Sequence, residues 1–551
     1  MICNNYNESE DVIMPYKAPS YVYQTNKKTG VKYVYENYPY WVTEIGQSRS
    51  KRKCIGILDE ETGEIVPTRG RKPKQGKSAS GSTEASIPSN RLFYGATYLL
   101  DAIGNKLGII SDLKACFPDT YKQILSIAYY LILEDSSPLY RFEKWASIHK
   151  HPYGRDISSQ RSSELFASIS ESAKDRFSML QGKRRVEKEF WVYDTTTISS
   201  YSKALRQVQY GHNKEYDPLA QLKLALVYGE QSGLPFYYRK LAGNIPDTKT
   251  VRRLLDDLVS LGFDKVKLVM DRGFYSEDNI NGLYREHLKF LVSAKTSLSF
   301  VRKEIDAVYD NIRMFANYDQ DHGLYAYTAT AEWNYAQARP YKGDVIKDKR
   351  RIYVHMYFNI SKAAEDERNF TSNLAALREE LLTGKRMEEH EKQYAKYFDI
   401  KATPKRGIQV TTKEDAIKEA KRYYGYFTLL SNETMSAIDA LELYRAKDII
   451  EKAFGNLKER LDMRRALVSS EKSLDGKLFV EFVALIFLSY IHKQMQSKKM
   501  YKDYTMQEVL DKLDVIECFE RSGHKLRVGE ILEKQNQIYI DLAIDPISSL
   551  Q

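Results

Sequence analysis

The sequence is poor in cysteine, shows no secretion signal and has no apolar run long enough to cross a bilayer. Its four cysteines are far apart and form no Cys-x-x-Cys pair, which argues against a disulfide framework or a structural zinc site. The N-terminus lacks the basic-then-apolar pattern of a signal peptide. The most apolar stretch, 478–491, contains Glu481 and is too short to span a membrane. We therefore expect a protein of the reducing cytoplasm with no membrane partner.

What the chain does contain is length, positive charge and tyrosine. Its 551 residues exceed a single typical core, so several domains are expected. The net charge of +10 and the pI of about 8.9 suit a polyanionic partner, although a ribosomal or membrane-surface protein could carry the same charge. The 42 tyrosines supply side chains that can both stack and hydrogen-bond.

Two short apolar runs are each followed by an aspartate. The run 189–193 precedes Asp194, and the run 265–270 precedes Asp271. A strand that ends in this way places a carboxylate at the edge of a sheet, and Gly273 permits the turn that follows. A single aspartate at a strand end more often only closes a turn, so a further carboxylate is needed to favour a functional site.

A third acidic residue lies on a segment of helical period, 444–458. At 3.6 residues per turn, Tyr444, Lys447, Glu451 and Lys458 share one side of a predicted continuous helix. A carboxylate, two ammonium groups and a phenol on one face favour a functional site. The alternative is an ordinary solvated helix face.

These residues resemble the DDE transposases of the insertion-sequence-four superfamily. In that family the last acidic residue belongs to a Tyr, Arg, Glu, Lys signature, and here Lys447 stands where the Arg is expected. The substitution keeps the charge and loses the bidentate fork of a guanidinium. The resemblance extends over Asp194-Thr-Thr, Gly233-Leu-Pro, Gly243-Asn-(x)2-Asp247, Asp271-Arg-Gly-Phe and the signature segment.

The resemblance implies an RNase H-like catalytic core that uses metal ions. Asp194, Asp271 and Glu451 would be catalytic and would hold two Mg²⁺ or Mn²⁺ ions, with Asp194 bridging them. The DNA contacts it implies are Tyr444, Lys447, Lys458 and Arg272.

Two further features were weighed as DNA contacts. Trp333 could stack on an extruded base, although an isolated tryptophan is more often part of a core. The basic run 68–74 resembles an AT-hook that lacks the usual Arg after the proline, and the alternative is a basic linker. The cations of this run are Arg69, Arg71, Lys72 and Lys74.

The predicted fold class is multidomain α/β, with an RNase H-like mixed sheet flanked by helices and interrupted by an insertion domain. Ahead of it we expect a β-meander and an all-helical module, both of them probable DNA-binding regions. The expected boundaries are 1–67 for the β-meander, 68–90 for the basic flexible linker, 91–185 for the helical module, 186–295 and 424–496 for the two parts of the core, 296–423 for the insertion and 497–551 for a C-terminal tail.

The predicted function is that of a DNA transposase. It would bind the terminal inverted repeats of an insertion sequence as double-stranded DNA, cleave there and join the ends to target DNA. Bringing two ends together implies a homodimer, and the resemblance implies a bacterial, nucleoid-associated location. One alternative is a transposase-derived DNA-binding protein that no longer cuts, against which the three acidic residues argue. Another is an RNase H-like nuclease without strand transfer, which would not need region 1–184.

Overall fold

The computed structural model describes most of the chain and consists of two compact units. The units are residues 1–86 and residues 87–551, and each is described by itself. The described residues are 20–26, 29–42, 47–59, 62–66, 89–135, 137–184, 189–211, 217–263, 266–339, 343–403, 407–461, 468, 470–521 and 524–547.

The first unit contains an antiparallel sheet in the order β1-β2-β3-β4. Gly30 takes a φ of 70° in the turn between β1 and β2, which pair as an antiparallel hairpin. The basic residues Arg52 and Lys53 lie within β3. The AT-hook-like run, with Arg69, Arg71, Lys72 and Lys74, lies outside the described residues. The strands are β1 (Ser20–Thr25), β2 (Lys32–Val42), β3 (Gln47–Leu58) and β4 (Ile65–Val66).

The second unit begins with the helical module that the periodicity predicted. Ser158 and Ser170 each cap a helix by accepting a backbone N–H at the third helical residue. Every residue of α3 from Ile124 to Leu133 is buried, so this helix lies inside the module. The helices are α1 (Gly95–Lys106), α2 (Ile109–Cys116), α3 (Tyr121–Leu133), η1 (Leu139–Arg141), α4 (Phe142–Ala146), α5 (Ser159–Ser168) and α6 (Glu171–Lys183).

The helix α15 (Glu471–Ser497) joins this module to the main sheet. It packs against α3 and α5 of the module and against β8 of the sheet, and its residues from Leu478 to Ile491 are all buried. Among the described residues, no helix is both long and apolar enough to cross a membrane.

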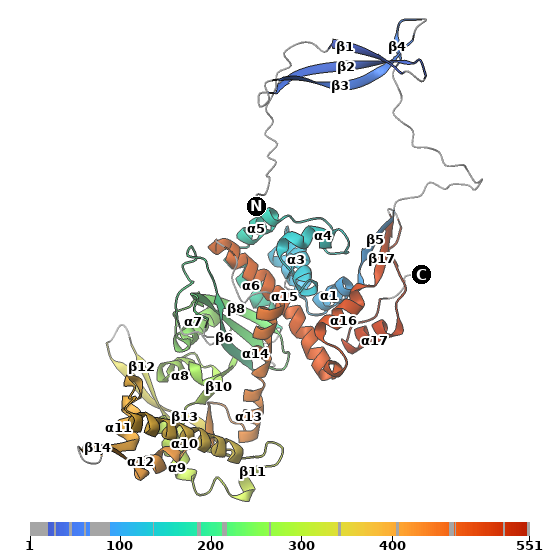
Figure 1. Cartoon of the computed structure of the whole chain (residues 1–551). Coiled ribbons are helices and arrows are strands. Elements are labelled where there is room, and N and C mark those ends of the chain that lie inside the picture. The colour runs from blue at the N-terminus through green and yellow to red at the C-terminus, as the bar shows by residue number, and fades with distance from the viewer. Residues whose placement is uncertain are drawn as a thin grey trace. The chain divides into compact units, whose positions relative to one another are not determined.

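The C-terminal tail completes the helical module, a role that the sequence did not predict. Its strand β17 pairs antiparallel with β5, and the Tyr539 hydroxyl donates to the Gly95 carbonyl at 2.8 Å. A Cβ on Gly95 would lie 2.2 Å from the Leu513 carbonyl oxygen, so only glycine allows this approach. Figure 1 shows the red tail elements beside the blue α1 and β5. These elements are β5 (Ser89–Phe93), η6 (Met500–Lys502), α16 (Met506–Asp514), β17 (Glu517–Arg521), β18 (Arg527–Val528) and α17 (Glu533–Asp541).

The main sheet has nine strands within the described residues, in the order β11-β12-β13-β16-β10-β9-β6-β7-β8. Strands β6, β7 and β8 pair antiparallel, whereas β6, β9 and β10 pair parallel across helical connections. The mixed sheet flanked by helices confirms the predicted fold class. The five strands are β6 (Trp191–Ser199), β7 (Gln221–Gly229), β8 (Pro235–Ala242), β9 (Lys267–Met270) and β10 (Lys289–Ala294), and the connecting helices are α7 (Asp247–Ser260) and α8 (Glu277–Arg285).

The interruption between β10 and β16 (Tyr426–Ser431) extends this same sheet. Its long strands β12 and β13 join the sheet through β16. Its other helices enclose a small core of their own, which includes Leu377, Leu381 and Tyr394. The elements are α9 (Ser299–Val308), η3 (Phe315–Asn317), β11 (Tyr318–Asp319), β12 (Leu324–Ala338), β13 (Val345–Phe358), α10 (Ile360–Thr383), η4 (Glu388–His390), α11 (Glu391–Tyr397), β14 (Phe398–Thr403), β15 (Gly407–Thr412) and α12 (Glu414–Lys421).

The sheet buries both faces, and this fixes the direction of each side chain. On β6, Trp191 and Tyr193 enter the core under α7 and α8, whereas Val192 enters the core shared with α14 and α15. Because side chains alternate along a strand, Asp194 points to the same face as Val192. Its register partner on β7, Leu226, belongs to that second core as well.

Candidate active site

Asp194 and Asp271 each directly follow a strand residue, and these two preceding residues are paired across neighbouring parallel strands. Tyr193 of β6 lies opposite Met270 of β9, where β9 ends. We predicted that β6 ends at Asp194. The strand instead continues to Ser199, and in this last part it pairs with β7 alone. Asp194 therefore lies where the parallel partner strand stops, and Asp271 begins the turn that leaves it.

Local hydrogen bonds fix both aspartates. The Thr195 amide donates to Asp194 Oδ1 at 2.7 Å. After Asp271 the chain forms the 3-10 turn η2 (Arg272–Phe274), in which the Phe274 amide donates to the Asp271 carbonyl at 3.0 Å. The helix α8 then begins after its N-cap residue, Ser276, whose side chain accepts from the Asn279 amide. Asp271 is thus held between a buried strand and a capped helix, with its side chain 36% exposed.

The signature segment is less regular than the continuous helix that was predicted. It comprises α13 (Ala437–Arg445), α14 (Asp448–Gly455) and the π-helix η5 (Asn456–Arg460). Between α13 and α14 the amides of Lys447 and Ile450 bond to carbonyls three residues back, which tightens the winding there. The tight turn and the wider π-helix change the phase of the side chains, so their contacts cannot be derived from an ideal helical wheel.

Two signature side chains converge on Asp271 despite this irregularity. The Tyr444 hydroxyl donates to Asp271 Oδ1 at 2.5 Å. The Lys447 ammonium lies 3.7 Å from Asp271 Oδ2 and 3.3 Å from Glu451 Oε1. Lys447 thus links Asp271 to Glu451, and the helical segment, the strand end and the turn meet at one place.

The electrostatics of Asp271 favour the carboxylate form. Burial by itself would raise its pKa, but the hydrogen bond from Tyr444, the charge of Lys447 and the contacts with Arg272 outweigh burial and lower the pKa below its usual value. The pKa of Tyr444 is raised, first by burial and then by its bond to Asp271. Tyr444 therefore stays protonated and acts as the donor in this bond.

The three predicted metal ligands have the donor chemistry that a hard divalent ion requires. All three offer carboxylate oxygens, and Asp271 and Glu451 already flank one cation, the Lys447 ammonium. In the part of the chain that the structure describes, no three His, Cys, Asp or Glu side chains lie close enough together to enclose a metal. The three residues fit a divalent metal ion because they offer carboxylate oxygens and lie at the same end of the sheet. Glu451, whose side chain is 58% exposed, is the one with room to move.

The remaining predicted contacts occupy different environments. Arg272 is exposed in η2, beside Asp271, and Lys458 is half-buried in η5. Trp333 is only 5% exposed, donates its indole N–H to Asn281 and packs edge-on against Phe300. This burial leaves Trp333 no open ring face for a base, so we do not include it in the DNA surface proposed below.

A supporting network beside Asp194 was missed by sequence reasoning. Asp247 Oδ1 accepts hydrogen bonds from the Thr195 hydroxyl at 2.9 Å and from the Lys223 ammonium at 2.6 Å. Lys223 also donates to the Ile245 carbonyl at 2.9 Å, and its side chain is only 7% exposed. Thr195 thus connects Asp247 to Asp194 through its hydroxyl and its amide. The available signal was a single lysine in the otherwise apolar strand β7.

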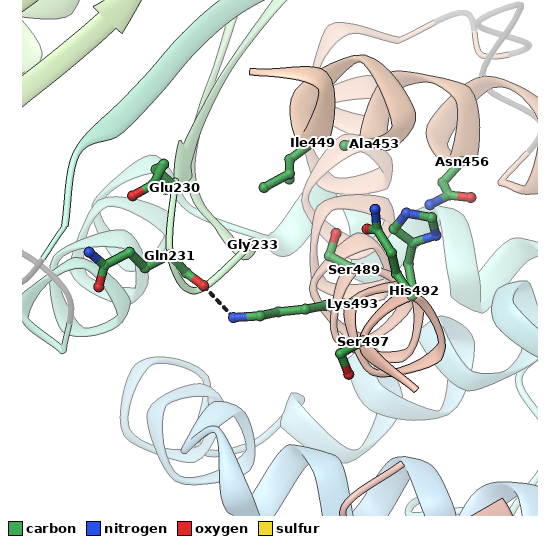
Figure 2. A pocket seen from close by; sticks show the side chains of 11 residues that line it. Glu230, Gln231, Gly233, Ile449, Ala453, Asn456, Ser489, His492, Lys493 and Ser497 are labelled. Atoms are coloured by element: carbon green, nitrogen blue, oxygen red, sulfur yellow. Dashed lines mark hydrogen bonds between the residues drawn. The ribbon is translucent and has the colours of Figure 1, made fainter. Parts of the chain in front are cut away.

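A cavity of about 230 Å³ lies on the opposite side of α14 from Glu451. Ile449 and Ala453 line it and stand two positions before and after Glu451, which places them on the other face of the helix. Figure 2 shows these side chains facing α15, where Lys493 donates to the Gln231 carbonyl. The cavity therefore does not belong to the carboxylate site.

The fold and the site define a class of protein with an RNase H-like core and acidic residues gathered at one end of the sheet. The family model described as "Transposase DDE domain" matches residues 187–487. The chain belongs to this family of transposases.

Comparison with solved structures finds a similarity to the piggyBac transposase synaptic complex with hairpin DNA. The identity is 10%, the TM-score is 0.32, and the match covers 75% of this chain and 70% of the other. A likeness at this level supports no conclusion about this chain. No curated protein matches the sequence.

Proposed function

We propose that this transposase is of the insertion-sequence-four type: it binds the terminal inverted repeats of its element, cleaves DNA there and joins the ends to target DNA. The observation that carries the proposal is the convergence of Tyr444 and Lys447 on Asp271, which neighbours Asp194 across paired strands. An ordinary solvated helix face would make no such contacts with Asp271, which is distant in the sequence. The family match is independent support for the same class of enzyme.

The proposed metal ligands are Asp194, Asp271 and Glu451, which would hold Mg²⁺ or Mn²⁺. Two such ions, when bound, activate a water or a 3′-hydroxyl and stabilise the leaving oxygen of a phosphodiester. The chain contributes rigid placement, because Asp194 lies within a buried sheet and Asp271 lies between a strand and a capped helix. Tyr444 orients the Asp271 carboxylate by donating to Oδ1.

The proposed DNA contacts are cations near these carboxylates, together with the N-terminal regions. Arg272 is exposed next to Asp271, and Lys458 follows Glu451 on the same segment, so both suit phosphate oxygens. Recognition of the element ends is assigned to the β-meander, the basic linker and the helical region, residues 1–185. Because two ends must be joined together, the active complex is proposed to be a homodimer.

The test is to incubate the purified full chain with DNA carrying the native element's ends and Mg²⁺ or Mn²⁺, and to sequence the products. Asp194→Asn, Asp271→Asn and Glu451→Gln should each abolish cleavage and leave end binding nearly intact. Glu442→Gln is the matched control, because it makes the same charge change at an exposed carboxylate of α13. This control should cut like the parent.

Each result has a defined meaning. Cleavage at the parent rate by any of the three site variants would overturn the assignment of that residue. End binding without cleavage by the parent protein would instead support the alternative, a transposase-derived DNA-binding protein. Cleavage without joining to target DNA would indicate a nuclease.

A further inference from the structure

The chain departs from the insertion-sequence-four signature at Lys447, and this residue lies between two acidic side chains. Its ammonium lies between two carboxylates that are proposed to bind metal, 3.7 Å from Asp271 Oδ2 and 3.3 Å from Glu451 Oε1. The side chain is mostly buried, at 18% exposed. A single positive charge thus stands between the two groups that the proposed function assigns to divalent ions.

We propose that the Lys447 ammonium is an internal counterion, which holds Asp271 and Glu451 together in the DNA-free protein and must leave when a divalent ion binds. This inference rests on the proposed function. It gives Lys447 two successive partners, the carboxylates before metal binds and a DNA phosphate afterwards.

The chemistry of lysine explains why this residue suits such an exchange. An ammonium is a compact point charge on a flexible stem, so it fits between two carboxylates and can rotate away. The guanidinium that the family signature has here is a planar fork, which prefers two parallel bonds to one carboxylate or phosphate. Lysine in place of the signature arginine therefore changes which anions the cation binds, while the charge stays the same.

The geometry also predicts that Lys447 opposes metal binding. Both carboxylates lie within 4 Å of the ammonium, so an ion held by the same oxygens would be repelled by it. Two unit charges 4 Å apart interact, even in water, by enough to change a binding constant about fivefold, and by more in a partly buried site. Removing the charge should therefore strengthen metal binding, although it removes two favourable ion pairs from the metal-free protein.

The experiment measures Mn²⁺ binding to the full chain without DNA, by calorimetry or by the spectroscopic signal of free Mn²⁺. Lys447→Met should bind Mn²⁺ about fivefold more tightly than the parent, or better, and should be stabilised more by a given Mn²⁺ concentration in thermal melting. Lys447→Gln is a second neutral variant, in case the methionine variant folds poorly. Lys447→Arg keeps the charge and should stay near the parent affinity.

Lys452→Met is the matched control, because it removes one positive charge from an exposed position on the same helix. It should leave Mn²⁺ affinity near the parent value. Asp271→Asn in the parent identifies which binding belongs to this site.

Three outcomes are distinguishable. Tighter Asp271-dependent binding in the neutral variants, and in them alone, supports the counterion role. Equal affinity in the parent, Lys447→Met and Lys447→Gln, with binding still lost in Asp271→Asn, overturns the counterion role and leaves the proposed function standing. Absence of Asp271-dependent binding in the parent and in both neutral variants overturns the metal-dependent function, and the counterion role with it.

Discussion

The network of Lys223, Asp247 and Thr195 should behave as one energetic unit. Removing one partner of a buried ion pair costs about 3 to 5 kcal/mol, because the other charge stays buried and unpaired. We expect the lower end of this range, since the Asp247 side chain is 21% exposed. Asp247→Asn should lower the free energy of unfolding more than Lys223→Met does. It leaves an unpaired charge on Lys223, whose side chain is only 7% exposed.

The double variant Lys223→Met/Asp247→Asn is the informative one. It removes both charges, so its destabilisation should fall short of the sum of the single effects by about 2 kcal/mol. The assay is denaturant unfolding followed by tryptophan fluorescence, to which the buried Trp191 on β6 contributes. The exposed pair Lys349 and Glu332 provides a control cycle, in which the coupling should be much smaller.

Additive single effects, within about 0.5 kcal/mol, would refute the reasoning, because they would show that the two charges do not depend on each other. The variants that carry Asp247→Asn should also weaken Mn²⁺ binding. In them the Thr195 hydroxyl would exchange a carboxylate acceptor for a weaker amide oxygen, and the Thr195 amide orients Asp194. A destabilised variant with unchanged Mn²⁺ affinity would restrict the network to a role in folding.

Three further predictions follow from the site and its surroundings. Tyr444→Phe removes a bond that helps to lower the pKa of Asp271. A carboxylate whose pKa is lower in the folded state than in the unfolded state stabilises the protein above the unfolded-state pKa. This stabilisation is lost as the pH falls through the folded-state pKa. The variant should therefore melt at a lower temperature than the parent at pH 7, and the two melting temperatures should converge in acid. Equal melting temperatures at neutral pH would contradict this. Trp333→Ala should lower stability by about 3 to 5 kcal/mol, as measured by denaturant unfolding, because it empties a packed core position; an unchanged unfolding midpoint would instead favour a surface role. Affinity for the element ends should fall steeply with salt in a binding titration, because cationic contacts release counterions from DNA, and a flat response would argue against a phosphate-contact surface.

Much of the catalytic core could be predicted because its signals are local. The apolar runs before Asp194 and Asp271 identify β6 and β9, and Ser276 marks the start of α8. The error at β6 was one of length: residues 195–199 are three Thr, one Ile and one Ser, and the β-branched residues among them continue the strand beyond Asp194.

Features that depend on contacts between distant segments could not be predicted in the same way. Nothing local to β12 and β13 shows that they extend the main sheet through β16, because strand pairing is decided by tertiary packing. No role was predicted for the C-terminal tail, because the strand with which it pairs, β5, lies at the other end of the unit in the sequence.

The signature segment explains why the candidate site was found although its predicted shape was wrong. The contact between Lys447 and Glu451 spans four residues, and one helical turn preserves such a pair whether it starts inside a helix or at the N-cap residue just before it. The contact between Tyr444 and Asp271 depends on where α13 ends against β9 and β10. That position is set by packing of Ala440 and Leu441 onto the sheet, not by the regularity of the helix. The tight turn after Tyr444 then directs Lys447 to the same aspartate, so two residues from separate helices meet one carboxylate.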